Sequence, residues 1–102
     1  MTSLAEAREA LDELVHSPVR FTLMSALNSV DSADYQTVRD ALGVSYALLT
    51  KHATLLESAG YLKVTKGFRG KTPRTVYSLT RKGRDAYAAH LAALDSIVRG
   101  LA

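Results

Sequence analysis

The chain has 102 residues, of which 47% are hydrophobic, with no cysteine and a formal net charge of +3. This length and composition suit one compact domain over residues 1–102, and the lack of cysteine excludes disulfides, thiolate metal sites and cysteine nucleophiles. The chain has no apolar run of about 18 residues, so we expect no membrane span. Its acidic N-terminus (MTSLAEARE) does not resemble a signal peptide, which favours a cytoplasmic protein.

The basic residues are unevenly distributed along the chain. Residues 58–84 hold eight of the thirteen Lys and Arg residues and no acid, whereas residues 1–15 hold four acids against one arginine. A solvated surface normally mixes both signs of charge, so this separation favours a polyanionic partner. The eight cations are Lys63, Lys66, Arg69, Lys71, Arg74, Arg81, Lys82 and Arg84.

Three helices are predicted in the first part of the chain. Ser3 and Glu6 have the spacing of a capping box, which predicts a helix over residues 3–16. Ser17 followed by Pro18 predicts a second helix that ends near residue 27. After a polar loop, Asp34 is a cap for a third helix over residues 35–42.

Residues 41–60 have the pattern of a helix-turn-helix. Gly43 suits the left-handed end of one helix, and Ser45 suits the N-cap of the next. Leu49, Ala53 and Leu56 form the buried stripe of this second helix, and Gly60 closes it. The opposite face is small, polar and mildly basic, so it can enter a DNA major groove, although an ordinary amphipathic helix would give the same local pattern. That face carries Tyr46, Ala47, Thr50, Lys51 and Thr54.

A β-hairpin is predicted after Gly60. Residues 61–66 and 75–79 alternate apolar with polar or basic residues, as half-exposed strands do. Residues 67–74 contain two glycines and a proline, which predicts a flexible turn region between them. Long cations at such a tip can reach phosphates or the minor groove. They are Lys66, Arg69, Lys71 and Arg74.

The last predicted helix covers residues 81–101 and is capped by Thr80. Its apolar residues follow a heptad spacing over about two repeats, which can pack inside the domain or against a second copy. The first helix has a leucine stripe of its own, so we expect it to pack beside this last helix. The heptad positions are Tyr87, Leu91, Leu94, Val98 and Leu101.

This order of elements resembles the winged helix-turn-helix transcriptional regulators of the MarR and ArsR type, especially the short regulators made of one domain. The resemblance covers about four-fifths of the chain. It rests on SPVRFTLMSAL (17–27), ALGVS (41–45), TKH and LLESAGYL within 50–62, KGFRGKTPRTVYSLT (66–80) and RKGR (81–84). Ala53 departs from the pattern, because these regulators commonly have leucine there. The implied fold is α+β, mainly α, with a helix-turn-helix at 35–60 and a wing at 61–79.

The resemblance implies a homodimer that binds double-stranded DNA at an inverted repeat and represses transcription. The helices over 3–16 and 81–101 would form the dimer interface, with half-sites roughly 34–36 Å apart. Tyr46, Ala47, Thr50 and Lys51 would face base edges or the adjacent backbone, while Ser45 and Thr54 would bind phosphates. The wing contacts would come from Lys66, Arg69, Lys71 and Arg74.

Other functions are weighed against this interpretation. His16, His52 and His90 fall on three separate predicted helices without metal-ligand spacing, so neither a metal nor a cofactor is expected. No phosphate loop, carboxylate pair or activated nucleophile indicates an enzyme. The remaining alternative is a winged helix that binds protein or RNA, which would expose apolar residues on its recognition face.

A small-molecule effector is compatible with the sequence. Such a ligand would lie in a crevice between the dimer helices and the DNA-binding core. Five aromatic residues are candidates to line it, although core packing explains most of them more simply. They are Tyr35, Tyr61, Phe68, Tyr77 and Tyr87.

Overall fold

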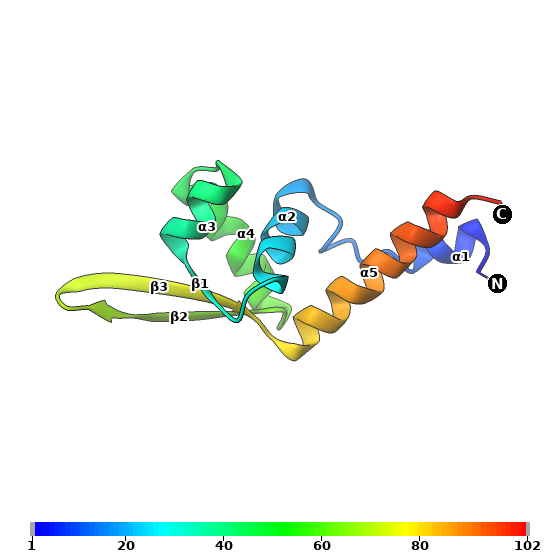
Figure 1. The fold of residues 1–102 in the computed structure, drawn as a ribbon. Helices are drawn as coiled ribbons and strands as arrows, with labels where there is room; N and C mark the ends of the chain where they lie inside the picture. Colours follow the sequence, from blue (N-terminus) through cyan, green and yellow to red (C-terminus); the bar gives the residue numbers. More distant parts are fainter. Residues whose placement is uncertain (1, 102) are drawn as a thin grey trace.

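The computed structural model describes residues 2–101, which form five helices and three strands. A long two-stranded hairpin extends from one end of the molecule, and the first helix lies beside the last one at the other end (Figure 1). The winged-helix expectation, α+β and mainly α, is confirmed. The elements are α1 (Leu4–Glu9), α2 (Pro18–Asn28), β1 (Ala33–Asp34), α3 (Tyr35–Leu42), α4 (Tyr46–Ser58), β2 (Leu62–Arg69), β3 (Thr72–Leu79) and α5 (Arg81–Arg99).

Each helix begins at the N-cap that the sequence predicts. In every case the capping side chain accepts a backbone N–H from the first turn, which would otherwise lack a partner. Accepting the Thr37 N–H also lowers the pKa of the Asp34 carboxyl. The five caps are Ser3, Ser17, Asp34, Ser45 and Thr80.

The first helix is much shorter than predicted, because it ends at Glu9 instead of continuing to residue 16. The cause is Asp12. Its Oδ1 accepts the backbone N–H groups of Leu14 and Val15, at 2.9 and 3.4 Å, and its own N–H donates to Nδ1 of His90. These bonds replace the backbone hydrogen bonds that would continue the helix. Aspartate side chains are known to compete with helices in this way, because they bind nearby backbone N–H groups.

The wing is also more regular than predicted. Residues 67–69 and 72–74 belong to β2 and β3, with Gly67 opposite Arg74 and Arg69 opposite Thr72, so the expected eight-residue turn region shrinks to Gly70 and Lys71. Gly70 has φ +62°, as the first central residue of a tight hairpin turn requires. The third strand, β1, pairs with β3 only at Val76 and Tyr77, so the outer wing is a free two-stranded ribbon.

The core lies where α2, α3 and α4 meet the base of the wing. The helix-turn-helix angle is set by Gly43, whose φ of +66° ends α3 in the left-handed region. Burial of these apolar side chains fixes α4 against α2 and the sheet. The most buried residues of this hydrophobic core are Leu23, Met24, Leu27, Leu49 and Leu56, and Val38, Leu62, Tyr77 and Leu79 pack around them.

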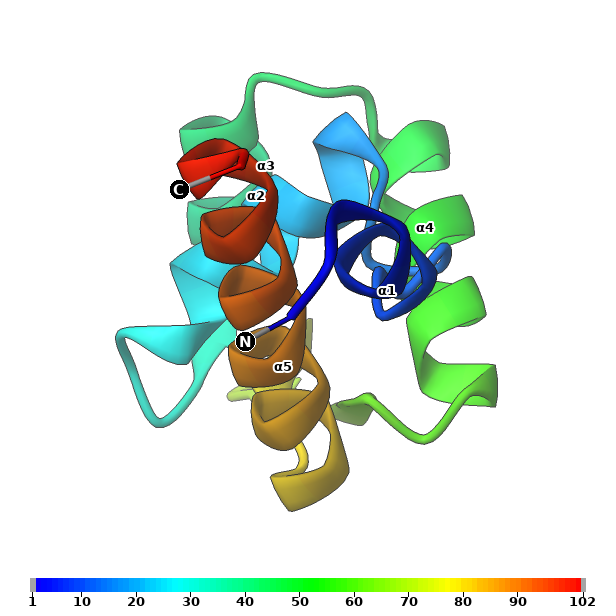
Figure 2. The same ribbon diagram turned by 90° about the vertical axis from the view of Figure 1, so that its right-hand side faces the viewer.

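Helix α5 packs beside α1 (Figure 2). Its inward face is formed by Gly83, Tyr87, His90 and Ala93. The heptad positions therefore do not all pack inside the fold: Tyr87 is buried, but Val98 and Leu101 are 82% and 94% exposed. No helix within residues 2–101 is long and apolar enough to cross a membrane.

Candidate DNA-binding site

The predicted recognition face of α4 is exposed to solvent. Tyr46, Ala47, Thr50, Lys51 and Thr54 all point outward, whereas the stripe of Leu49, Ala53 and Leu56 is buried. Ser45 is exposed as well, and its Oγ accepts the Leu48 N–H at 3.1 Å. That bond leaves the Ser45 hydroxyl proton free to donate to a phosphate.

A cleft of about 390 Å³ lies between α4 and one face of the wing. Thr50 and Thr54 border it from the helix, and Lys66 borders it from β2. At its mouth Tyr46, which is 58% exposed, meets the Tyr35 ring edge to face with centroids 5.2 Å apart. The fold thus brings recognition-helix hydroxyls and a wing cation to one concave surface. The remaining lining residues are Ala53, Glu57, Val64, Thr75 and Tyr77.

The wing cations do not share one face of the hairpin. Side chains alternate along a strand, so Lys66 points to the side of α4 while Arg69 and its neighbour in β3, Arg74, point to the other side. Arg69 and Arg74 border a second hollow of about 260 Å³ that includes Asp34. Lys71 occupies the turn itself. The positive charge therefore surrounds the wing.

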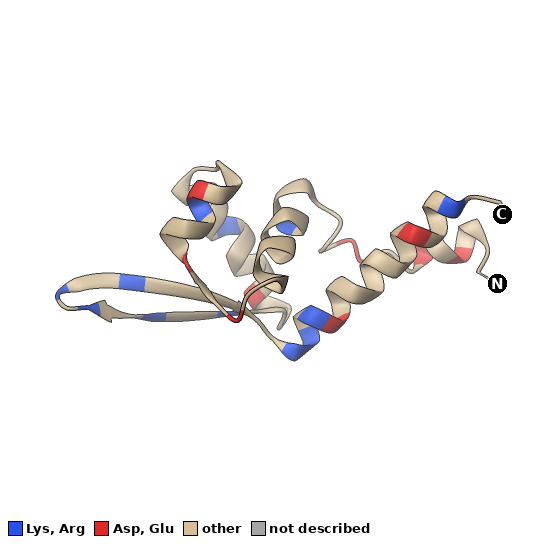
Figure 3. Ribbon diagram, viewed as in Figure 1, with Lys and Arg blue, Asp and Glu red and all other residues tan. Residues whose placement is uncertain are grey.

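The charge pattern divides the molecule along its length. Blue segments follow the wing without any red, while the acidic segments lie on the helices and the loops between them (Figure 3). Within residues 2–101 the two salt bridges are Arg81–Asp85 and Arg99–Asp95, so neither includes a wing cation. The wing cations are thus available to a polyanion.

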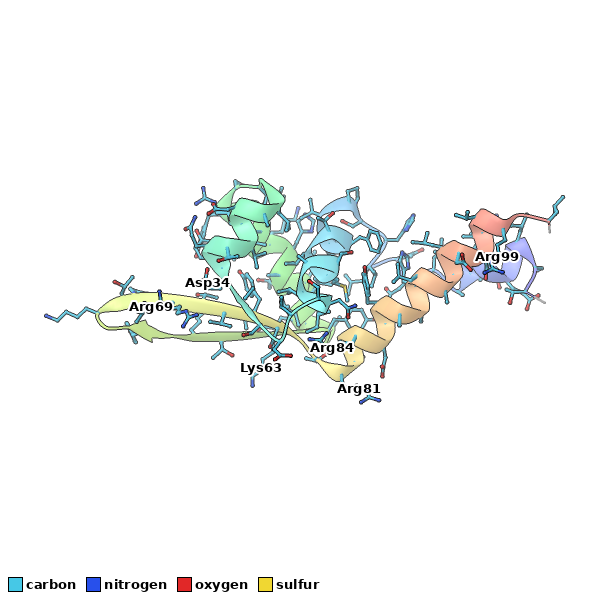
Figure 4. All side chains as sticks on the ribbon, in the orientation of Figure 1. Asp34, Lys63, Arg69, Arg81, Arg84 and Arg99 are labelled. Carbon is cyan, nitrogen blue, oxygen red and sulfur yellow. The ribbon has the colours of Figure 1, made fainter. Side chains whose placement is uncertain are left out.

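Two members of the predicted basic cluster serve the fold instead, and a third makes only an exposed ion pair within α5. Lys82 donates to the Ala59 carbonyl at 2.9 Å and lies over the Tyr61 ring. Arg84 donates to the Asn28 and Val30 carbonyls. Arg81 pairs with Asp85 at 3.4 Å. These side chains lie at the start of α5, away from the outer wing that carries Arg69 (Figure 4).

Two histidines that are far apart in the sequence meet in space. Nδ1 of His16 lies 3.2 Å from Nε2 of His90, which the separate positions of these residues in the sequence did not suggest. His90 Nδ1 already accepts the Asp12 N–H, so the proton of the neutral ring must sit on Nε2. A metal needs a lone pair on that nitrogen. Within the described residues, no group of three or more metal-binding side chains forms.

His52 belongs to the scaffold behind the recognition helix. Its Nδ1 lies 2.9 Å from Nη1 of Arg20, whose Nε donates to the Leu14 carbonyl. Burial, followed by the charges of Arg20 and Lys51, lowers the pKa of His52. A neutral ring can accept the Arg20 N–H, and this bond ties α4 to α2.

The five aromatic residues that the sequence offers as an effector lining do not share a crevice. Tyr35 and Tyr77 border the cleft beside α4. Tyr87 is buried and bonds Ser25, and Tyr61 donates to Asp12. Phe68 stands on the outer wing, 74% exposed. The hollow beside α5 is a different one, of about 250 Å³, bordered by His16, Ser17, Pro18, Phe21, His90 and Leu94.

Two features of the site escape the sequence pattern. Glu57 lies in the cleft because it is one turn beyond Ala53 and Thr54 on the wing side of α4. Helical spacing from Tyr46 and Thr50 could have placed it there. Phe68 is exposed because the strands continue past Gly67, and only the full pairing of the hairpin shows this.

Residues 19–98 match the winged helix DNA-binding domain family. The chain belongs to that family. Among curated proteins, none matches this chain. Among solved structures, a transcriptional regulator homologue from Pyrococcus horikoshii is 27% identical, with a TM-score of 0.83 over 88% of this chain and 89% of that one.

Two more distant structures share the winged-helix fold. A putative MarR-family transcriptional regulator from Porphyromonas gingivalis is 22% identical, with a TM-score of 0.67 over 85% of this chain and 80% of that one. The regulator AbfR, solved in an overoxidised form bound to DNA, is 18% identical, with a TM-score of 0.73 over 88% of this chain and 65% of that one. The predicted resemblance to winged helix-turn-helix transcriptional regulators is confirmed, and this winged-helix protein is a DNA-binding transcriptional regulator and not an enzyme.

Proposed function

We propose that this winged-helix protein is a cytoplasmic repressor that binds an inverted-repeat operator as a homodimer. One observation carries the proposal: Thr50 and Thr54 of α4 share a cleft with Lys66 of the wing, so one DNA strand can contact both elements at once. The recognition helix would enter the major groove while the wing binds the flanking backbone or minor groove.

The contacts divide into those that read sequence and those that position the protein. Tyr46, Ala47, Thr50 and Lys51 face base edges or the adjacent backbone, and threonine and lysine are both suited to read bases. Ser45 and Thr54 bind phosphates through their hydroxyls. The wing cations bind phosphates without regard to sequence. They are Lys66, Arg69, Lys71 and Arg74.

The dimer would form through the terminal helices. Apolar side chains of α1, of α5 and just after α5 remain outside the core of a single chain, where a second copy can cover them. They are Leu91, Val98 and Leu101, with Leu4 beside them at the N-terminus. Half-sites on the operator would then lie roughly 34–36 Å apart, one turn of the double helix.

The rival function, a winged helix that binds protein or RNA, is less well supported by the recognition face. On that face Tyr46 is the one large aromatic residue, and the rest of the face is alanine, threonine and lysine. An effector between the dimer helices and the DNA-binding core remains a prediction, and the hollow beside His16 and His90 lies in that region.

The decisive experiment is a gel shift on mixed genomic fragments, followed by sequencing of the retained DNA. Affinity should fall about 1,000-fold or more between roughly 50 and 200 mM salt, if six or more phosphates are bound. Arg69→Ala should weaken binding to all sequences alike, whereas Thr50→Ala or Lys51→Ala should change which sequence is preferred. Arg81→Ala, at the start of α5 and away from both the outer wing and the proposed dimer stripe, is the matched charge control (Figure 4). A flat salt response would end the proposal.

A further inference from the structure

Phe68 is the most exposed large aromatic side chain of the described residues, at 74%. It stands one residue from the last pair of the hairpin, with Pro73 directly opposite in the register. Leaving a phenylalanine in water forgoes the burial of a large apolar area. The two apolar residues lie in a segment with cations on every side and no acid, so a duplex is a better fit than an acidic protein surface.

The direction in which Phe68 points follows from strand alternation. Val64 and Lys66 border the cleft against α4, and Phe68 is the next residue on the same face of β2. Phe68 therefore faces the space in front of the recognition helix. DNA would occupy this space when α4 lies in the major groove.

The reach of the wing matches the spacing of the grooves. Phe68 lies four residues beyond Val64, about 13 Å along the strand. Adjacent major and minor grooves are about half a helical turn apart, roughly 17 Å. The two lengths are similar, so a wing that runs along the duplex from the cleft would bring Phe68 close to the minor groove that flanks the recognition helix.

The backbone that carries Phe68 is ordered by strand pairing. Pairing is continuous to Arg69 and Thr72, and the turn has only two residues. Lys66 shares the face of Phe68 and Lys71 follows in the turn, so both can bind phosphates beside the groove, while Arg69 lies on the other face of β2. An apolar side chain beside phosphate-binding cations is the arrangement that wedges base steps apart.

On the basis of the proposed operator binding, we propose that Phe68 is a minor-groove wedge. It inserts its ring at one base step beside each half-site, partly unstacks that step and bends the duplex. Flexible pyrimidine–purine steps unstack most easily, so the wedge selects them at a position that the recognition helix does not touch.

The test uses a duplex of about 30 base pairs that the wild-type protein enriches from a random-sequence pool. 2-Aminopurine replaces single adenines across the flanking minor groove, and its fluorescence rises on unstacking. The wild-type protein should raise the signal at one step in each half-site. Phe68→Ala should abolish that rise and weaken binding roughly 10-fold, because an aromatic–base contact is lost, while the salt dependence stays the same.

Arg69→Ala is the matched control, since it changes the adjacent residue on the other face of β2. It should reduce the salt dependence and keep the fluorescence rise. Phe68→Ala should keep the wild-type fold, because so exposed a side chain contributes little to the core, and circular dichroism verifies this.

Three results would overturn the wedge. If Phe68→Ala binds and unstacks DNA like the wild type, Phe68 serves another partner, such as a protein. If the wild type binds without any fluorescence rise, Phe68 contacts only the groove walls. In both cases the proposed operator binding stands. If the wild type enriches no duplex, that proposal fails and the wedge fails with it.

Discussion

His90 donates its Nε2–H to Nδ1 of His16 across 3.2 Å, and its own Nδ1 accepts the backbone N–H of Asp12 at 3.1 Å. Both nitrogens of the buried ring are therefore occupied in the neutral form. A second proton on His90 would break the Asp12 bond, and a proton on Nδ1 of His16 would face the Nε2–H. The junction of α5 with the N-terminal segment is built for a neutral His90.

The first prediction is that acid destabilises the protein. Burial and then the neighbouring His16 lower the pKa of His90 from 6.5, against a smaller opposing effect of Asp12, and burial lowers the pKa of His52. The unfolded chain therefore takes up protons first, so this stability is present above about pH 6.5 and is lost as the pH falls below it. Urea unfolding at about pH 8 and about pH 5 measures the loss.

His90→Asn separates the two histidines in that experiment. The asparagine oxygen can still accept the Asp12 N–H, but the side chain does not titrate. The variant should lose less stability on acidification than the wild type, although it starts from a lower value. Equal losses in the two proteins would show that groups other than His90 cause the effect, and a gain in stability on acidification would contradict a neutral His90.

The second prediction concerns Tyr61, which ties the base of the wing to the N-terminal segment. Its hydroxyl donates to Oδ2 of Asp12 at 2.5 Å, and this bond, with burial, raises the pKa of Tyr61 to about 12. Tyr61→Phe should reduce the free energy of unfolding by about 1.5–3 kcal/mol at neutral pH, since the bond is to a charged group. Chemical denaturation of both proteins gives the difference.

The sign of the alkaline response provides the control for Tyr61. A raised pKa means that the folded state holds its proton more tightly, so this contribution is full below pH 10.0 and fades as the pH rises toward 12. The stability difference between wild type and Tyr61→Phe should shrink over that range. A constant difference would mean that the phenol group contributes through packing and not through its bond to Asp12.

The parts of the fold that depend on residues close together in the sequence could be predicted. N-caps such as Ser45 and Thr80 act within three residues, and the helical period places Thr50 and Leu49 on opposite faces of α4. The early end of α1 was not predictable, because Asp12 reaches a histidine 78 residues away. No local pattern contains such a contact.

The wing shows the same limit in a different way. Glycine and proline between residues 67 and 74 are turn signals, yet strand pairing extends to Arg69 and Thr72. Proline is tolerated there because the outer ribbon has free edges. This extension decides which cations face α4 and exposes Phe68, so the chemistry of the wing followed from tertiary pairing and not from composition.

The third prediction tests the close packing of α5 on the segment between α4 and β2. A Cβ at Gly83 would lie 2.1 Å from the Tyr61 carbonyl oxygen, and the backbone on both sides is fixed. Gly83→Ala should therefore destabilise the protein by about 3 kcal/mol or more. Gly67→Ala is the matched control, because nothing lies within 4 Å of the new methyl group. Thermal unfolding should leave the Gly67 variant near the wild type, and similar losses in both would contradict the packing argument.

The fourth prediction addresses the proposed dimer. Val98 is 82% exposed in the single chain, so lysine there should fold normally but oppose burial against a second copy. Val98→Lys should weaken dimer formation at least about tenfold, as sedimentation velocity can measure. Ala92→Lys, on the exposed side of α5 away from this stripe, should leave the dimer intact. If Val98→Lys sediments with the same dimer mass as the wild type, the dimer interface does not include this part of α5.

The last prediction concerns Glu57, the one carboxylate among the residues that border the cleft between α4 and the wing. A phosphate placed between Thr54 and Lys66 would be repelled by that charge, so Glu57→Gln should raise affinity for mixed-sequence duplex about two- to fivefold. Fluorescence anisotropy measures the change, with Glu9→Gln on α1 as the control for net charge. If affinity falls instead and the preferred sequence shifts, Glu57 accepts a hydrogen bond from a base, most simply the cytosine amino group. It would then belong with Thr50 and Lys51 among the residues that read sequence.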